Sequence, residues 1–485
     1  MDRVDELKIR VERVDDHRWR IPRTGGMRTE GLVFADDGLM EQLREDRALL
    51  QVANVACLPG IVGRSLAMPD IHWGYGFPIG GVAAFDEEEG VISPGGVGYD
   101  INCGVRLLRS DLEERDVRPR LGALVDRLFE ALPSGVGARR RDVVLGRDEL
   151  AGVLREGAGW VVGRGHGRPD DLDAIESRGA LPGADPDALS DRALRRGRDQ
   201  LGTLGSGNHF AEVQVVERVF DPCAAAALGL EEGRVAVMIH SGSRGLGYQV
   251  CDDFIELMLE AADRYGIDLP DRQLCCAPIP SPEGRRYLAA MNAAANYAFG
   301  NRQMMASRAR DTFAALFGRD AAEGMRTVYD VCHNIAKFEE HESDGVRRRV
   351  CVHRKGATRA FPLGHPEIPE RYREVGQPVL IPGDMGRYSY VAVATEAGYA
   401  ETFGSSCHGA GRRMSRTKAR RSVGGRDVVG ELADRGIEVR SDTNRTVAEE
   451  VSEAYKDVKD VIRVVEAAGI GRAVVRLRPI GVVKG

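Results

Sequence analysis

The chain has 485 residues, and its 68 basic and 74 acidic side chains give a formal net charge of −6. A composition of 43% hydrophobic and 29% charged residues excludes a disordered chain, a fibrous repeat and a membrane protein. No run of about 18 apolar residues could span a bilayer, and the charged first 25 residues do not resemble a secretory leader. We therefore expect a cytoplasmic protein whose nine cysteines are reduced thiols.

Residues 147–198 are rich in Gly, Asp and Arg with little periodicity, and predict a surface excursion. Short β-branched runs bounded by glycine or polar residues predict strands at 235–240, 350–353, 378–382 and 473–480. Apolar periodicity predicts helices at 249–265 and 286–317, the second interrupted at Gly300. Because strands and helices mix without a regular alternation, we expect an α+β fold, with sheets flanked by helices in one large domain over residues 1–485.

Five histidines lie beside Gly, Ser, Asn or Asp where predicted strands end, and such positions collect binding groups. These are His72, His209, His240, His333 and His408. Four others, in charged or loop-like sequence, are expected at the surface or in the core without a functional role: His17, His166, His341 and His365.

The segment from Ser93 to Arg106 places Asp100 three residues before Cys103, so one turn can direct a carboxylate and a thiolate at the same point. With His209, His240 and His333 as nitrogen donors, such a set would hold two divalent cations roughly 3.5–4 Å apart, a spacing used in phosphoryl transfer. The competing interpretation is that Cys103 is a buried structural cysteine.

Two glycine-containing segments, at 382–385 and 408–411, present successive backbone N–H groups that can bind phosphate oxygens. His408, followed by Arg412 and Arg413, is placed to attack phosphorus, although a histidine that caps a turn would give the same pattern. Six of the ten residues from 412 to 421 are basic, which favours a surface that faces an anionic ligand. The smaller clusters at 139–141 and 195–198 are interpreted as solvated surface.

The segments Met68-Pro-Asp-Ile-His-Trp-Gly-Tyr-Gly-Phe-Pro-Ile-Gly-Gly-Val and Arg478-Pro-Ile-Gly-Val-Val-Lys484, with the motifs between them, resemble the RtcB family of tRNA-splicing RNA ligases. The resemblance covers nearly the whole chain. It implies that Asp100, Cys103 and His209 bind one Mn²⁺, that Cys103, His240 and His333 bind a second, and that His408 is the nucleophile that becomes guanylylated.

The resemblance also implies a guanylate pocket, in which Glu212 receives guanine N–H groups and Tyr455 lines the base. The implied pocket comprises Asn208, His209, Phe210, Ala211, Glu212, His333, Asn334, Pro382, Gly383, Asp384, Met385, Ser389, His408, Gly409, Ala410, Gly411, Tyr455 and Lys484.

The implied reaction joins RNA 2′,3′-cyclic phosphate or 3′-phosphate ends to 5′-hydroxyl ends with GTP and Mn²⁺, in tRNA splicing or RNA repair, with the small protein archease as a possible partner. It passes through a His408–GMP adduct and an RNA-(3′)pp(5′)G end. The alternative is a two-metal phosphodiesterase or phosphatase that uses the Asp/Cys/His cluster without any nucleotidyl intermediate.

Overall fold

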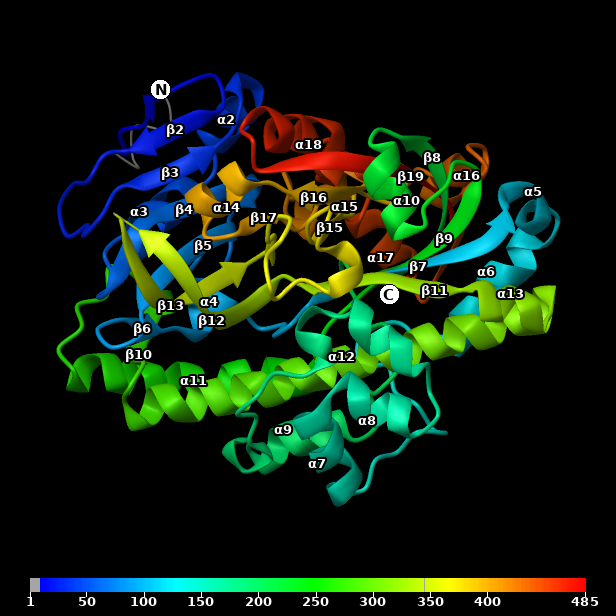
Figure 1. The fold of residues 1–485 in the computed structure, drawn as a ribbon, viewed down its shortest axis with the longest axis horizontal. Coiled ribbons are helices and arrows are strands. Elements are labelled where there is room, and N and C mark those ends of the chain that lie inside the picture. The colour runs from blue at the N-terminus through cyan, green and yellow to red at the C-terminus, as the bar shows by residue number, and fades with distance from the viewer. Residues whose placement is uncertain (1–8, 344) are drawn as a thin grey trace.

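The computed structural model describes residues 9–343 and 345–485, which form two large, mainly antiparallel sheets side by side (Figure 1). In this part of the chain the first sheet has seven strands in the order β1-β2-β3-β4-β5-β13-β12. Their bounds are β1 Glu12–Arg13, β2 Arg18–Ile21, β3 Gly31–Phe34, β4 Ile61–His72, β5 Ile79–Asp86, β12 Asn334–Ser343 and β13 Val346–Lys355. Only the β3–β4 pair of this sheet is parallel.

The second sheet, counted over the same described residues, has eight strands, seven in the order β11-β7-β9-β8-β19-β16-β15, with β18 alongside β19. Their bounds are β7 Gly104–Glu113, β8 Phe210–Val219, β9 Arg234–Ser241, β11 Arg326–Cys332, β15 Pro378–Ile381, β16 Ser389–Ala394, β18 Glu438–Ser441 and β19 Gly471–Lys484. β19, the last of these strands in sequence, therefore lies inside the sheet, between β8 and β16.

Two small ladders complete the strands, β6 (Val91–Ile92) with β10 (Ala277–Pro278) and β14 (Ala357–Arg359) with β17 (Ser405–Cys407). The sheets are flanked by helices, and the α+β prediction is confirmed. The helices are α2 Asp37–Leu43, α3 Ala48–Val55, α4 Pro94–Val97, α5 Glu114–Val117, α6 Leu121–Ala131, α7 Arg147–Glu156, α8 Ala158–Gly163, α9 Asp191–Gly197, α10 Pro222–Leu228, α11 Arg244–Arg264, α12 Pro282–Phe317, α13 Arg319–Gly324, α14 Glu396–Thr402, α15 Arg416–Val423, α16 Val428–Ala433, α17 Asn444–Glu449 and α18 Val458–Ala467. None of these helices combines the length and apolar character that crossing a bilayer requires.

All four predicted strands are present, each within one or two residues of expectation or longer. The predicted interruption at Gly300 is wrong, because α12 runs unbroken through it for 36 residues. A Cβ at Gly300 would lie 3.1 Å from Val153 Cγ1 and 3.3 Å from Val161 Cγ2, so glycine lets α7 and α8 pack closely against α12. Here the glycine permits close packing and does not end the helix.

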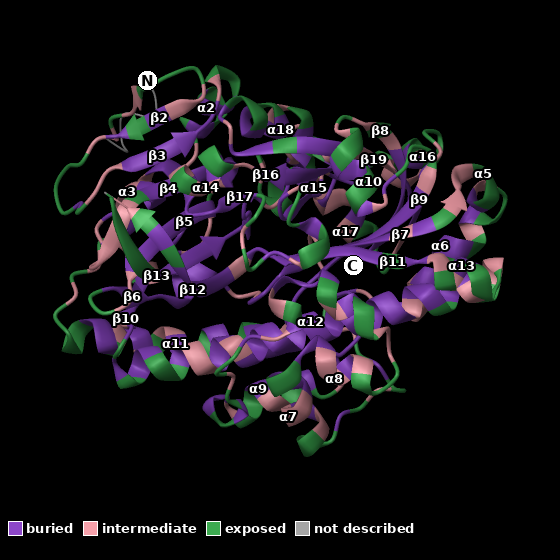
Figure 2. Cartoon of the chain, in the orientation of Figure 1, coloured by how far each residue is buried: buried purple, intermediate pink, exposed green. Residues whose placement is uncertain are grey.

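The segment 147–198 contains more regular structure than its composition predicted, namely α7, α8, α9 and short 3₁₀ turns on the side of α12 away from the sheets (Figure 1). It also contributes to the core, since Leu150, Val153 and Val161 are buried in one cluster with residues of α12. Figure 2 shows that α12 itself, which lies between this segment and the sheets, is largely buried. Asp171 accepts two hydrogen bonds from the Arg310 guanidinium, at 2.6 and 2.7 Å, in a buried ion pair. The segment is thus anchored to α12 by both apolar and charged contacts.

Candidate active site

Four neighbouring strands of the second sheet bring the predicted metal ligands together. Cys103 precedes β7, His209 precedes β8, His240 lies near the end of β9 and His333 follows β11. In the register, Val105 lies opposite His240, which in turn lies opposite Phe210, while Gly104 lies opposite Cys332. The order β11-β7-β9-β8 places these strand ends side by side, and the ligands therefore meet at one end of these four strands.

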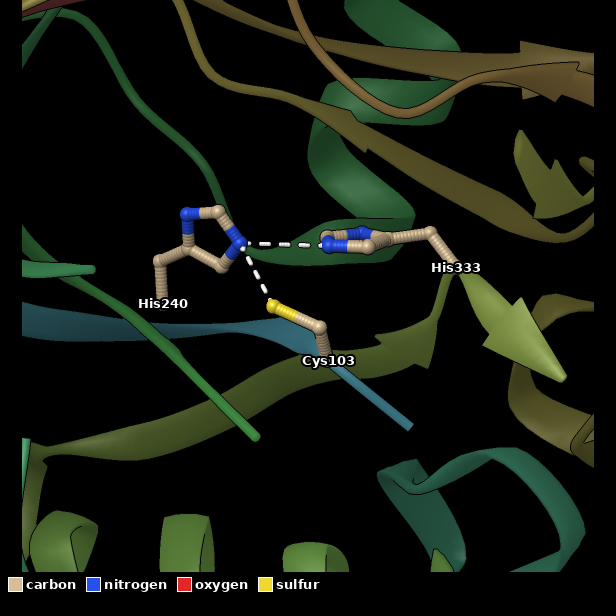
Figure 3. A group of neighbouring side chains, drawn as sticks. All are labelled: Cys103, His240 and His333. Carbon is tan, nitrogen blue, oxygen red and sulfur yellow. Dashed lines mark hydrogen bonds between the residues drawn. The ribbon is translucent and has the colours of Figure 1, made fainter. Parts of the chain in front are cut away.

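The side chains of this cluster converge through their polar atoms, and Figure 3 shows this for Cys103, His240 and His333. Cys103 Sγ lies 3.2 Å from His240 Nε2 and 3.4 Å from His209 Nε2. His240 Nε2 lies 3.1 Å from His333 Nε2, and His209 Nε2 lies 2.8 Å from Asp100 Oδ2. Two groups of three, Asp100/Cys103/His209 and Cys103/His240/His333, each keep their ligand atoms within 4.8 Å of one another and share Cys103.

The chemistry of these ligand atoms is suited to binding metal ions. Burial lowers the pKa of His240 and of His333 well below the ordinary value and also lowers that of His209, so all three rings are neutral and carry lone pairs. Burial and the neighbouring Asp100 raise the pKa of the Cys103 thiol, and a bound cation would favour its thiolate. Thiolate, carboxylate and imidazole together suit Zn²⁺, Mn²⁺ and related divalent ions, and a shared thiolate can bridge two of them.

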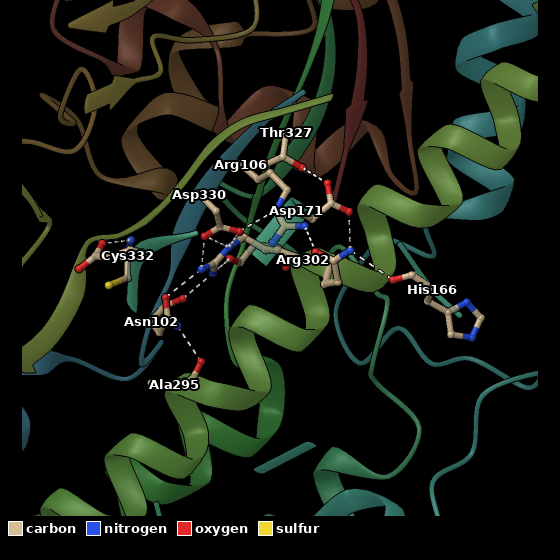
Figure 4. Close-up of polar contacts among 12 residues, drawn as sticks. Asn102, Arg106, His166, Asp171, Ala295, Arg302, Thr327, Asp330 and Cys332 are labelled. Carbon is tan, nitrogen blue, oxygen red and sulfur yellow. Dashed lines mark hydrogen bonds and ion pairs between the residues drawn. The ribbon is translucent and has the colours of Figure 1, made fainter. Parts of the chain in front are cut away.

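A buried ion network beneath the cluster fixes the backbone at Cys103 (Figure 4). Asn102 has a left-handed φ of 51°. The Arg302 guanidinium donates to the Asn102 carbonyl at 2.8 Å, to its side-chain oxygen at 3.0 Å and to Asp330 at 2.7 Å. The Asn102 amide in turn donates to the Ala295 carbonyl of α12 at 2.6 Å. Arg302 thereby positions the residue that immediately precedes the shared ligand.

His408 follows β17 and is oriented by Asp70 of β4, a buried residue that the sequence analysis did not assign to the site. His408 Nδ1 lies 2.6 Å from Asp70 Oδ2, and the backbone N–H groups of His408 and Gly409 donate to the same oxygen at 3.0 and 3.2 Å. Burial alone would raise the pKa of Asp70, but the attraction and hydrogen bonds of His408 hold it below its usual value. With the Nδ1 proton directed at this carboxylate, Nε2 of His408 keeps a lone pair for attack.

Two other histidine rings pack around His408. The His333 ring lies 5.0 Å from the His408 ring, centroid to centroid, and the His72 ring lies 6.4 Å away in a stacked arrangement. Burial lowers the pKa of His72 to about 3, so this ring is also neutral. The candidate nucleophile is therefore next to one ligand of the metal-binding cluster.

One cavity of about 300 Å³ joins the cluster and His408. Seventeen predicted residues line it: Cys103, Asn208, Phe210, Glu212, His240, His333, Asn334, Pro382, Gly383, Asp384, Met385, His408, Gly409, Ala410, Gly411, Tyr455 and Lys484. Asp100 and His209 belong to the metal-binding cluster beside it. The Ala211 side chain packs in the core on the other face of β8, because side chains alternate along a strand. Ser389 accepts a hydrogen bond from the backbone N–H of Gly383 at 3.3 Å and thus supports the 382–385 segment.

A second carboxylate that sequence reasoning missed, Glu450, organises the basic side of the cavity. It lies 3.0 Å from Arg412, 3.5 Å from Arg416 and 3.6 Å from Lys484, and it accepts a hydrogen bond from the Tyr455 hydroxyl. Burial would raise the pKa of Glu450, but Lys484 and Arg412 hold it below its usual value. Two members of the predicted basic run, Arg412 and Arg416, therefore face the cavity, although both are within ion-pair distance of Glu450.

Glu212 differs from Asp70 and Glu450 because its pKa is raised and not lowered. Burial raises its pKa to about 7, although a hydrogen bond from Gln214 at 2.8 Å and the charge of Lys484 oppose the shift. The cavity also contains Lys355, whose pKa burial lowers to about 7, and the rings of Tyr75 and Tyr99, none of which was predicted. The walls thus hold acceptors, donors and aromatic surface, as a nucleotide requires.

The geometry defines the class of site, a buried cluster of side chains that could hold metal ions and that shares one cavity with an oriented histidine. The family model described as tRNA-splicing ligase RtcB matches residues 51–485. The tRNA-splicing ligase RtcB of Thermococcus kodakarensis is 55% identical over 479 residues, covering 98% of this chain and 99% of that protein. That of Archaeoglobus fulgidus is 56% identical over 478 residues, with the same coverage. The RNA-splicing ligase RtcB of Mycobacterium tuberculosis is 54% identical over 438 residues, covering 90% of this chain and all of that protein.

The chain belongs to the RtcB family of RNA ligases, and the resemblance found in the sequence is confirmed.

Proposed function

We propose that this protein joins RNA ends bearing a 2′,3′-cyclic phosphate or 3′-phosphate to 5′-hydroxyl ends, with GTP as the source of a guanylyl group. Its relatives are named as tRNA-splicing and RNA-splicing ligases, which supports an RNA substrate. The proposed substrates are tRNA halves or broken RNAs. The observation that carries the proposal is His408, held at Nδ1 by Asp70 and lying in one cavity with the Asp100/Cys103/His cluster.

The first step uses His408 as the nucleophile. Its Nε2 lone pair forms a bond to the α-phosphorus of GTP while the bond to the bridging oxygen breaks and pyrophosphate leaves. The imidazole gains positive charge as the bond forms, and the Asp70 carboxylate at 2.6 Å stabilises that charge. Ionised Glu212 accepts guanine N–H groups, which adenine does not offer in the same pattern.

The next steps transfer and then release GMP. An oxygen of the RNA 3′-phosphate, generated by hydrolysis where the end is cyclic, attacks the phosphorus of the adduct, and His408 recovers its lone pair. The 5′-hydroxyl then attacks the RNA phosphorus, losing its proton as GMP leaves. Two Mn²⁺ ions, one held by Asp100, Cys103 and His209 and the other by Cys103, His240 and His333, would supply charge stabilisation to the phosphoryl oxygens. Dependence on archease and a cytoplasmic location stay predictions.

Labelling with α-³²P GTP and Mn²⁺ tests the proposal. We expect acid-labile label on the wild-type protein and none on His408→Ala, because the Nε2–phosphorus bond cannot form in the variant. His17→Ala, at a partly exposed histidine that is not among the residues lining the cavity, is the matched control. A ligation assay with 3′-phosphate, cyclic phosphate and 3′-hydroxyl ends, under GTP or ATP, then defines the substrates. Hydrolysis of a cyclic phosphate with no label on the wild type would instead support the two-metal phosphodiesterase.

A further inference from the structure

A second space lies next to the active-site cavity. This outer groove, of about 850 Å³, is lined by His72, Trp73, Arg413, Arg416, Lys418 and the 45–47 segment, among others. Four residues line both spaces: His72, Ile79, Arg412 and Arg416. The groove therefore adjoins the cavity on the side of His408, whose ring stacks against that of His72.

The outer groove carries a positive excess. Its cationic lining residues are Arg47, Arg412, Arg413, Arg416, Lys418 and Lys456, against two carboxylates, Glu45 and Asp46. Arg412 and Arg416 are within ion-pair distance of Glu450, and Arg420, which lies on α15 with Arg416, is within ion-pair distance of Glu449. Within the described residues, Arg413 and Lys418 are exposed and lie in no ion pair. These two charges are available to phosphates that follow one another along a strand.

Trp73 is the aromatic element of the groove. It is 58% exposed, whereas Trp19 is 8% exposed, although tryptophan buries more apolar surface than any other side chain. The exposed Trp73 ring lines the same groove as Arg413 and Lys418. Proteins bind single-stranded nucleic acid with this combination, because every base offers a face for stacking and the backbone offers phosphates.

We propose that the outer groove binds the RNA strand that bears the 3′-phosphate, with Trp73 stacking on a base near its end and Arg413 and Lys418 contacting its phosphates. The assignment rests on the proposed function, in which GMP passes from His408 Nε2 to the terminal phosphate. An oxygen of that phosphate must come within bonding distance of the phosphorus that His408 Nε2 carries. Because the outer groove shares His72 and Arg412 with the cavity that holds His408, a strand whose terminal phosphate reaches His408 would place its next nucleotides along Trp73.

Ligation of two separate RNA strands tests this assignment, with one strand varied while the other is saturating. We expect Trp73→Ala to raise KM for the 3′-phosphate strand about tenfold, from the loss of one stacked base, and to leave KM for the 5′-hydroxyl strand unchanged. Trp73→Phe, which keeps a ring, should recover most of the loss. Leu363→Ala removes a side chain of similar exposure, 56%, outside the groove and is the matched control.

A direct binding measurement keeps the test valid if Trp73→Ala folds poorly. Titration of the wild type with a 3′-phosphate oligonucleotide should quench tryptophan fluorescence, and Trp73→Phe should lose that quenching. The Arg413→Gln/Lys418→Gln variant should bind with a slope of log affinity against log salt that is shallower by roughly 0.7 per lost contact.

Three results would overturn the assignment: an unchanged KM for the 3′-phosphate strand, an equal rise for both strands, or a rise for the 5′-hydroxyl strand alone. An unchanged KM with no quenching would also mean that the indole serves another partner, such as a protein. Labelling each preparation with α-³²P GTP, a step that needs no RNA, gives its active fraction, to which ligation rates are normalised. Absence of label on the wild type would be failure of the proposed function, a result distinct from failure of the groove.

Discussion

Two buried polar clusters lie next to each other in this protein, and they differ in how their polar atoms are paired. Around Arg302 and Asp330, both fully buried, every guanidinium nitrogen of Arg302 donates to a protein oxygen. In the metal-binding cluster, two neutral imidazoles face each other through Nε2 at 3.1 Å, and Nδ1 of His209, His240 and His333 has no hydrogen-bond partner among the described residues.

This difference in hydrogen-bond pairing distinguishes a cluster that stabilises the fold from a cluster that can bind a ligand. A buried polar group that is fully hydrogen-bonded to its own chain stabilises the fold and needs nothing further. In the other cluster, imidazole nitrogens, a thiol sulfur and a carboxylate oxygen converge on one another, which is the arrangement that cation binding requires. Similar burial thus serves two purposes, and the pairing of the atoms shows which.

The largest effect should come from removing the shared ligand. Cys103→Ala takes a donor from both groups of three, so we expect loss of bound Mn²⁺ and of ligation together. In the wild type, Mn²⁺ at 100 times its Kd should add about 2.7 kcal/mol to the free energy of unfolding, and the variant should lack this gain. Metal analysis and thermal melts with and without Mn²⁺ measure both. Cys275→Ala, another buried cysteine, is the control, and normal Mn²⁺ content in Cys103→Ala would contradict the assignment.

Disrupting the ion network around Arg302 and Asp330 should lower the free energy of unfolding whether or not metal is present. Arg302→Met leaves the buried Asp330 carboxylate without one of its two arginines, and we expect a loss of about 3–5 kcal/mol in denaturant unfolding. Arg326→Met removes an exposed partner of Asp170 and should change stability by about 0–1 kcal/mol. If both substitutions had the same small effect, the contrast between the two clusters would be wrong.

A smaller effect is expected from Asp70→Asn, which keeps the shape of the side chain but removes the charge beside His408. The rate of guanylylation should fall about 100-fold or more, because the amide cannot stabilise a positive imidazole, while GTP affinity changes little. Single-turnover labelling at several GTP concentrations separates rate from affinity. A matched change at Asp46, a carboxylate of the outer groove, should leave the labelling rate near that of the wild type.

The smallest effect concerns pH. Since burial raises the pKa of Glu212 to about 7, the carboxylate is mostly ionised at pH 8 and mostly protonated at pH 6. Only the ionised form accepts both guanine N–H groups, so GTP affinity should weaken about tenfold over this range. Calorimetric titration across pH measures it. Glu212→Gln should bind weakly at every pH, whereas Glu217→Gln, on the same strand, should keep the wild-type profile.

Much of the metal-binding cluster was predictable from sequence, because its ligands stand in short motifs with glycine neighbours. Asp70 was not predictable from local pattern, since its partner His408 lies 338 residues away. The same holds for Glu450 and for Arg302, whose roles come from side chains that only folding brings near. At Gly300 the local sequence predicted an interruption that is absent, because the glycine allows α7 and α8 to pack closely against a continuous α12.

The position of β19 has a consequence for synthesis on the ribosome. Because residues 471–484 form an inner strand between β8 and β16, neither of those strands can pair on that side until this segment has been made. Open edges are sites of intermolecular pairing, and contacts so distant in sequence form slowly. Newly made chains therefore pass through a stage in which aggregation competes with closure of the sheet.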